Sequence, residues 1–515
     1  MSRKELVTDV LIVGAGPTGL MAANQLKRFG INFIIIDSKS GPTRESRAIA
    51  VTARSLEIYQ QMNLSNRAIK EGKRMKSFNL YSNGKRRAEV KIGEIGKGMS
   101  EFSFMLAFEQ SKNEEILTQN LIDQGGQVHW HHEFIELKEN QDSIIAEVLH
   151  NGENRLISAQ YLIACDGASS PVRTQLNFSF KGGTYDHKFF VADALINWDL
   201  AYDKLLISPG DKNFCAFLPL NGERGYRVLG TLPLVFADRE DITFSDIESV
   251  VIQTIGIKIT FEEVNWFSIY KLHHRSVDHF KEGRVFLAGD SAHIHSPAGG
   301  QGMNTGLQDA YNLCWKLSMV LRNKAKPSLL DTYNEERLPF AKWLINFTDR
   351  GFTMMTSNNW FIKFFRQHFA LRLAGLVLKF SFFRPFIFKT LAQIGYSHKG
   401  RSLSESLTTQ KLSINAGDRL PYFDGKSIYP LFTKANFHLL HIANEPLTDD
   451  QVNQYSGYFP FPIEVVENKI AEEWTKLGVR KEIFMLIRPD NYTALIFDDF
   501  VPDQLKKYLS KHFNI

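Results

Sequence analysis

The sequence predicts mixed α/β and α+β architecture, with a dinucleotide-binding domain, an inserted β-sheet domain and a C-terminal α/β domain. Three observations carry this prediction. A G-x-G-x-x-G turn joins an apolar strand to a helix near the N-terminus, several β-like runs fill 180–275, and an α/β pattern resumes after residue 405. A length of 515 residues is enough for three or four domains, at roughly 100–200 residues each.

The N-terminal pattern runs strand 9–13, glycine turn, helix 17–29, strand 31–37. The glycines permit a tight turn and close approach of a ligand to the backbone, and the helix N-terminus offers free N–H groups to a pyrophosphate. A carboxylate at the end of the second strand can accept hydrogen bonds from ribose hydroxyls. The order predicts a Rossmann-type unit; the alternative is a βα turn with glycines kept for packing. The residues assigned to it are Gly14, Gly16, Pro17, Thr18, Gly19 and Asp37.

Two later strands also end in an acid beside a glycine. Residues 161–167 (YLIACDG) end at Asp166, and 284–290 (RVFLAGD) end at Asp290. The second strand is followed by a Pro- and Gly-rich loop and then a long helix from about Met303. This arrangement predicts a second cradle for phosphates and rings, which an NAD-binding Rossmann domain does not need.

With these motifs and P-A-G-G-Q-G-M-N at 297–304, the sequence resembles the FAD-dependent aromatic monooxygenases of the para-hydroxybenzoate hydroxylase and phenol hydroxylase type, the group A flavoprotein hydroxylases. The resemblance covers about residues 8–345. It implies FAD as the cofactor and NADPH or NADH as a transiently bound co-substrate, and the sequence does not choose between the two nicotinamides.

The resemblance also assigns residues. It implies that Asp290 binds the ribityl chain and that the backbone of 297–304 lies beside the isoalloxazine ring. It suggests two catalytic candidates, Arg227 and His295, whose alternatives are a strand-edge salt bridge and a purely structural loop residue. The further cofactor-binding residues are Arg47, Gln110, Asp166, Gly289, Asp290, Pro297, Gly300, Gly302, Met303 and Asn304.

The implied reaction inserts one oxygen atom of O₂, through a flavin C4a-hydroperoxide, into an aromatic, phenolic or polyketide-like small molecule. Hydroxylation is the default, and epoxidation, Baeyer–Villiger insertion and antibiotic modification use the same scaffold. The alternatives are an FAD-dependent reductase or other oxidoreductase on this fold, and a non-catalytic FAD-fold binding protein. The intact glycines and both acids argue against the last of these.

The pattern and the resemblance together divide the chain into four parts. The C-terminal part is expected to be thioredoxin-like, and it has no Cys, which excludes disulfide exchange. The expected parts are an FAD-binding domain (1–75, 100–180 and 276–350), a substrate-binding sheet (76–99 and 181–275), a helical connector (351–404) and the C-terminal domain (405–515).

Composition excludes other classes of function. A net charge of +5 without a concentrated basic face argues against nucleic-acid binding. Three scattered Cys argue against a disulfide framework or a Cys-based metal site and favour the cytoplasm. No uncharged apolar run is long enough to span a membrane. His129, His131 and His132 resemble a metal site by composition, but in a strand the third would point away from the other two, so no metal is expected. We expect a monomer or homodimer.

One segment concentrates the unusual composition. Residues 361–390 carry nine of the 40 Phe and six Lys or Arg without any acid. This pattern is typical of a basic amphipathic surface that contacts a membrane or an anionic ligand. The alternative is a helical connector packed on the FAD-binding domain, with its basic side chains reaching outward.

Overall fold

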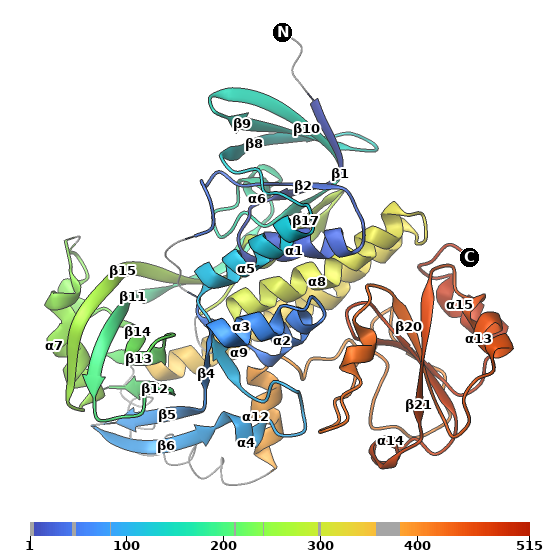
Figure 1. Ribbon diagram of the computed structural model, residues 1–515. Coiled ribbons are helices and arrows are strands. Elements are labelled where there is room, and N and C mark those ends of the chain that lie inside the picture. The colour runs from blue at the N-terminus through green and yellow to red at the C-terminus, as the bar shows by residue number, and fades with distance from the viewer. Residues whose placement is uncertain are drawn as a thin grey trace.

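The computed structural model describes residues 5–43, 48–82, 84–210, 213–239, 241–296, 300–356 and 382–515. Three main sheets organise the chain, one at the centre of the N-terminal half, one in the inserted region and one at the C-terminus. Figure 1 shows the inserted sheet and the C-terminal sheet on opposite sides of the central helices.

The first sheet has a parallel core in the order β17-β10-β1-β2. Its inner strands are nearly continuous apolar runs, such as Val10–Val13, because helices cover both faces. The predicted strands near 9–13, 31–37, 161–167 and 284–290 all lie in it. Its members are β1 (Glu5–Val13), β2 (Phe33–Ile36), β8 (His132–Glu139), β9 (Ile144–His150), β10 (Glu153–Ala164), β16 (Lys281–Glu282) and β17 (Val285–Leu287).

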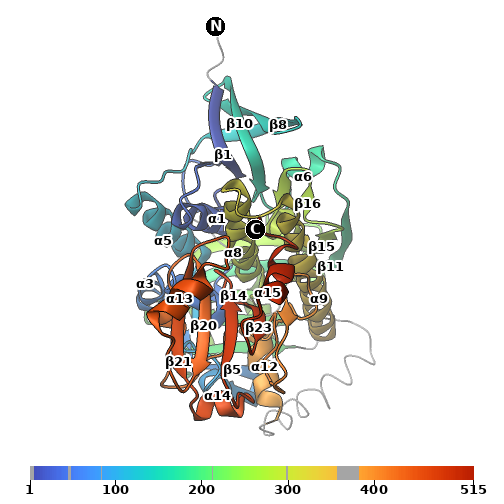
Figure 2. The same ribbon diagram turned by 90° about the vertical axis from the view of Figure 1, so that its right-hand side faces the viewer.

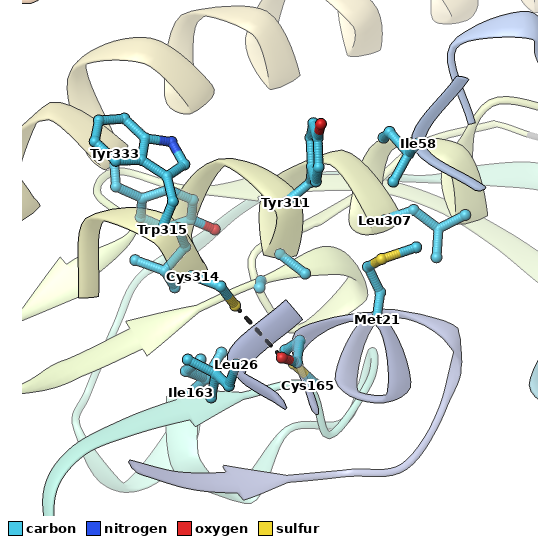
Figure 3. Packing of buried hydrophobic residues seen from close by; sticks show 14 of the residues in the cluster. Met21, Leu26, Ile58, Ile163, Cys165, Leu307, Tyr311, Cys314, Trp315 and Tyr333 are labelled. Atoms are coloured by element: carbon cyan, nitrogen blue, oxygen red, sulfur yellow. Dashed lines mark hydrogen bonds between the residues drawn. The ribbon is translucent and has the colours of Figure 1, made fainter. Parts of the chain in front are cut away.

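Helix α1 packs against α8 and α5 beside this sheet. Figure 3 shows Met21 of α1 beside Leu307 of α8. The Cys314 thiol of α8 points toward α1 and donates a hydrogen bond of 3.6 Å to the Ala22 carbonyl. The helices here are α1 (Pro17–Arg28), α5 (Gln110–Asp123), α6 (Pro171–Gln175), α8 (Gly302–Leu321) and α9 (Asp331–Thr356).

A small sheet in the order β3-β7-β4 connects this region to the inserted sheet. Strand β3 lies directly before α2, so the chain turns from sheet to helix beside the N-terminus of α8. The elements are β3 (Ala50–Val51), α2 (Ala53–Gln60), α3 (Ser65–Glu71), β4 (Lys73–Met75), α4 (Ile92–Ile95) and β7 (Met105–Ala107).

The inserted sheet has eight strands in the order β18-β15-β11-β14-β13-β12-β5-β6. Helix α7 (Phe244–Ile255) covers one face, with its own aromatic-rich core. The hairpin predicted for 76–92 is present as β5 and β6, and Gly84 has a φ of +70°. The strands are β5 (Ser77–Ser82), β6 (Lys85–Lys91), β11 (Phe180–Trp198), β12 (Lys204–Pro209), β13 (Phe214–Pro219), β14 (Gly225–Thr231), β15 (Ile259–Val277) and β18 (His293–Ile294).

The C-terminal sheet has the order β19-β23-β22-β20-β21 and carries a helix after β20, β21 and β23 (Figure 2). One face has a core of its own, while Phe437, Leu439 and Phe484 join the core of the N-terminal half. The elements are β19 (Glu405–Ser406), β20 (Phe437–Ala443), α13 (Asp449–Ser456), β21 (Ile463–Lys469), α14 (Glu472–Lys476), β22 (Ile483–Ile487), β23 (Thr493–Phe497) and α15 (Pro502–Leu509).

Within the Phe-rich basic segment 361–390, residues 361–381 lie outside the described residues. Its last part forms α12 (Phe383–Leu391), where Phe382 and Phe386 are exposed. Within the ranges that the model describes, no helix combines the length and the apolar character needed to cross a membrane.

Candidate active site

The glycine turn after β1 is built by two kinds of glycine. A Cβ on Gly14, which has a φ of +101°, would lie 2.3 Å from the Cys165 carbonyl oxygen, and one on Gly19 would lie 1.9 Å from the Gly14 oxygen. Close packing therefore requires glycine at positions 14 and 19. At Gly16 no atom lies within 4 Å of an added Cβ, and the N-terminus of α1 has no side-chain cap. Pro17 and Thr18 begin that helix, so its free N–H groups face open space at Gly16.

Asp37 closes the other side of this turn. Its carboxylate accepts hydrogen bonds from the backbone N–H groups of Ala15 (2.7 Å) and Lys39 (2.9 Å), which ties the end of β2 to the glycine turn. Gln110 begins α5 and donates to Glu114 (2.9 Å), whose other oxygen accepts from the Thr43 N–H. Arg47, predicted to bind the cofactor, lies outside the described residues.

The G-D turn after β17 packs tightly on the first cradle. A Cβ on Gly289, whose φ is +65°, would lie 2.5 Å from Thr18 Oγ1, and one on Gly306 of α8 would lie 2.2 Å from the same atom. Asp290 at this turn is exposed, yet desolvation by the surrounding protein raises the pKa of its carboxyl.

Asp166 follows the end of β10 by two residues. Burial raises the pKa of its carboxyl. One oxygen accepts a hydrogen bond from the Val172 N–H (3.2 Å), and the other is buried with no partner in the described part of the chain. Beside it, an added Cβ on Gly167 would meet no atom within 4 Å. Buried carboxylate oxygens are normally paired. The unpaired Asp166 oxygen is therefore available to accept a hydrogen bond from a ligand.

The turn before α8 is held by Asn304. Its side-chain oxygen accepts from the Thr52 N–H (2.9 Å) and the Ser55 hydroxyl (2.7 Å), and its amide donates to the carbonyls of Ala50 (2.8 Å) and Gly300 (2.9 Å). The Asn304 side chain is therefore fully used within the protein and shapes the turn. Thr52 and Ser55 were not predicted as site residues, because neither belongs to a motif.

The turn also depends on glycine. Gly300 has a φ of +63°, and an added Cβ would lie 2.6 Å from the Ala50 Cβ. Helix α8 begins at Gly302 and Met303 without a side-chain cap, so backbone N–H groups remain available at its N-terminus. Pro297, the first predicted contact of this loop, lies outside the described residues.

Comparison with known proteins shows which protein family contains this pair of glycine-rich turns. The family model described as "FAD binding domain" matches residues 7–348. The chain belongs to this FAD-binding family. The match spans both cradles and the inserted sheet, so the family extends over the whole predicted site.

Individual proteins that resemble the chain are named as monooxygenases. The chain is 32% identical to 6-methylpretetramide 4-monooxygenase of Streptomyces rimosus over 68% of this chain, but it spans only 63% of that protein. It is 27% identical to the uncharacterized aromatic compound monooxygenase YhjG of Bacillus subtilis over 98% of both chains. The fold matches the flavin-dependent monooxygenase PieE, solved with FAD and substrate, with a TM-score of 0.79 at 20% identity, covering 98% of this chain and 99% of that one.

The residues present fit FAD. Open space at Gly16 and the uncapped α1 suit a pyrophosphate, and the unpaired Asp166 oxygen and the exposed Asp290 carboxylate suit hydroxyl groups. The uncapped N-terminus of α8 offers N–H groups and a partial positive charge to the electron-rich edge of a flavin ring.

His293 and His295, which follow the G-D turn, have different surroundings. His293 Nε2 lies 2.7 Å from Asp309, which also accepts from Arg337 (2.7 Å) and from the Gly289 N–H, so His293 belongs to a buried structural network. His295 donates from Nδ1 to the Ser296 carbonyl (2.9 Å). Burial lowers the pKa of His295 to about 4, so its ring is neutral near pH 7 and its Nε2 is an acceptor.

Arg227, the other catalytic candidate, lies on β14 and is 2% exposed. Its Nε and one terminal nitrogen each donate to Asp193 of β11 at 2.7 Å, and the second terminal nitrogen reaches the Ala48 carbonyl at 3.4 Å. The salt bridge named as the alternative is present. Arg227 also connects the inserted sheet to the backbone at Ala48. Arg227 as a catalytic residue stays a prediction.

The histidine cluster differs from the strand we expected. His131 has a φ of +57°, and β8 begins only at His132. The expectation that 129–132 form one strand is wrong, because the chain turns at His131 to reach Lys39. The His132 ring stacks on that of His150 at 3.9 Å. Across the described ranges, no group of three or more His, Cys, Asp or Glu is placed to hold a metal ion.

Proposed function

We propose that this chain is an FAD-dependent, NAD(P)H-consuming monooxygenase that acts on an aromatic or polyketide-like small molecule, most simply by hydroxylation. The observation that carries the proposal is the placement of the uncapped α8 N-terminus, at the turn held by Asn304, where the inserted sheet meets the FAD-binding domain through β18 and β15. The relatives named above act on, or are named for, compounds of this class.

The chain's own residues contribute positioning and shielding. The α8 N-terminus and Gly300 shape the cradle for the flavin ring, and the inserted sheet adjoins it through the pairing of β18 with β15. Bound FAD supplies the electron transfer from NAD(P)H to O₂ that oxygen insertion requires. Helix dipole and backbone N–H groups stabilise negative charge on the ring without moving.

Three measurements test the proposal. The purified protein should contain FAD, absorb near 450 nm, and oxidise NADPH or NADH faster when a phenol or aromatic polyketide is present. With ¹⁸O₂, the product should gain one labelled oxygen atom. A colourless protein that binds no added FAD contradicts every flavin-based function, and a coupled product without the label contradicts monooxygenation.

The remaining expectations belong to the same proposal. The four parts of the chain serve as FAD-binding domain, substrate sheet, connector and thioredoxin-like domain, with the boundaries given above. The enzyme is a monomer or homodimer in the cytoplasm, and the three free, buried Cys support the reducing compartment. Contact of 361–390 with a membrane is tested by vesicle sedimentation with anionic and neutral lipids.

A further inference from the structure

One residue of the C-terminal region (405–515) contacts two helices whose N-termini meet at the turn before α8. Asp490 lies in the turn between β22 and β23 and is buried. Its backbone carbonyl accepts a hydrogen bond of 2.7 Å from Arg54 of α2. Its carboxylate accepts from the indole N–H of Trp315 on α8 at 3.0 Å and from the Asn312 amide at 3.3 Å. Asp490 therefore ties both α2 and α8 to the C-terminal region.

The Arg54 side chain is buried among groups that come largely from the C-terminal region. Its guanidinium lies 5.2 Å from the ring centre of Tyr492 and 5.7 Å from that of Tyr311. One terminal nitrogen donates to Glu57 at 3.2 Å, and Glu57 also accepts from Arg419. A buried guanidinium is stable only when it is paired, so residues after 405 fix where Arg54 lies.

The other side of the same helical turn holds the turn before α8. Thr52 and Ser55 lie on either side of Arg54 in the sequence, and both donate to the Asn304 side-chain oxygen, the Thr52 N–H at 2.9 Å and the Ser55 hydroxyl at 2.7 Å. The Asn304 amide in turn donates to the Gly300 carbonyl at 2.9 Å. One helical turn fixes residues 52–55 relative to one another, so the position of Arg54 determines the position of both donors to Asn304.

The contacts that hold this turn therefore come from outside the domain that forms it. The match to the FAD-binding family ends at residue 348, whereas Arg54 is held by Asp490 and Tyr492. The uncapped N-terminus of α8 can stabilise negative charge on a flavin ring only if it is held at a fixed position. The Cys-free C-terminal region thus has a structural route to the flavin cradle.

We propose that the C-terminal region positions the flavin cradle, with Asp490 and Arg54 as positioning residues that act through Asn304. The inference goes beyond the proposed function, because it requires bound FAD but no particular reaction. A cradle that is already held in place binds FAD without an ordering cost. Its helix N-terminus stabilises reduced, anionic FAD more than oxidised FAD. Loss of these contacts should therefore weaken FAD binding and make the reduction potential of bound FAD more negative.

The first test compares two substitutions at opposite ends of α2. Gln61, just after the helix, is buried and donates to the Phe432 carbonyl at 2.9 Å. Arg54→Met and Gln61→Met each remove a buried donor to a backbone carbonyl of the C-terminal region, so both should lower the melting temperature of the apoprotein. Only Arg54→Met should raise the Kd for FAD, by about tenfold, and make the reduction potential more negative. Fluorescence titration with FAD and equilibration with a reference redox dye measure the two properties.

A second pair of variants makes a smaller change and serves if Arg54→Met does not fold. Trp315→Phe keeps an aromatic ring but removes the N–H that Asp490 accepts from. Its control is Trp474→Phe, since Trp474 is equally buried and donates at 3.0 Å to Asn468 within the C-terminal region. Trp315→Phe should raise the Kd for FAD about threefold and shift the potential in the same direction. Trp474→Phe should change neither property.

The outcomes separate positioning from stability. Wild-type FAD affinity and potential in folded Arg54→Met overturn the inference, and the same result in Trp315→Phe does so if Arg54→Met does not fold. Equal changes in a variant and its control also overturn it, because they would reflect stability alone. These measurements use neither substrate nor O₂. A protein that behaves as expected here but inserts no labelled oxygen refutes the proposed function and leaves this inference standing.

Discussion

Arg488, at the end of β22, forms a two-point ion pair with Glu336 of α9, with nitrogen–oxygen distances of 2.5 and 2.9 Å. Both side chains are almost completely buried, and the same Glu336 carboxylate accepts from Lys316 of α8 at 2.8 Å. Burial alone would raise the pKa of Glu336, but Arg488 and Lys316 hold it well below its usual value. The C-terminal sheet is therefore joined to the helices that carry the cradle by a buried ionic network.

The first prediction tests this connection. Glu336→Gln should lower the free energy of unfolding by about 3–5 kcal/mol, because buried Lys316 loses its carboxylate partner and buried Arg488 keeps only Asp490 as a counter-charge. Urea unfolding followed by circular dichroism measures the effect. The control is Glu472→Gln, which breaks the exposed pair with Lys476 and should leave stability nearly unchanged. Equal effects of the two substitutions would contradict a stabilising role of the buried network.

The second prediction separates cofactor binding from packing at the glycine turn. Gly16→Ala should leave the stability of the apoprotein unchanged, since its Cβ meets no protein atom, yet weaken FAD binding about tenfold or more by blocking approach to the backbone. Gly14→Ala should destabilise the fold itself, because its Cβ would overlap the Cys165 carbonyl. Fluorescence titration with FAD and thermal unfolding of the apoprotein measure the two effects. Unchanged FAD affinity in Gly16→Ala would place the pyrophosphate elsewhere.

The third prediction concerns pH. His398 is 1% exposed with both ring nitrogens unpaired, and burial lowers its pKa to about 3. The unfolded state takes up the proton near pH 6.5 and the folded state does not, so this group makes stability fall as pH drops from about 6.5 toward 3. His398→Asn should make the free energy of unfolding depend less steeply on pH between about 4 and 6. The decrease in slope should correspond to up to one fewer proton taken up on unfolding. An unchanged slope would mean that His398 is protonated in the folded state.

The fourth prediction concerns Arg227. Arg227→Gln should lower the unfolding free energy by about 2 kcal/mol, less than the ~3–5 kcal/mol of fully buried pairs, because Asp193 is 20% exposed. Arg224→Gln, which alters the exposed pair with Glu262 near the same strand, should cost less than about 1 kcal/mol. If Arg227 has only this structural role, kcat per FAD-loaded, folded molecule should stay near the wild-type value in Arg227→Gln. A large loss of kcat at normal FAD content would support the catalytic prediction.

Much of the cradle could be predicted from the sequence, because glycines with a fixed spacing report local backbone requirements. Gly14 has a φ of +101° and Gly289 a φ of +65°. Both backbone conformations favour glycine, so a motif of a few residues can indicate them. The acids at the ends of β10 and β17 were predictable for the same reason. The turn at His131 was not, because it serves a backbone hydrogen bond to Lys39 in a different segment.

The FAD-binding family, the two cradles and the strands that carry them can be predicted from the sequence alone, since each depends on neighbours within a few residues. Which charged side chains meet is visible only in the folded chain. Asp193 accepts two hydrogen bonds from Arg227, Glu336 pairs with Arg488 152 residues away, and Tyr185 donates to Asp349 164 residues away. Such pairs depend on how sheets and helices pack, and a pattern of residue types along the chain does not record packing between distant segments.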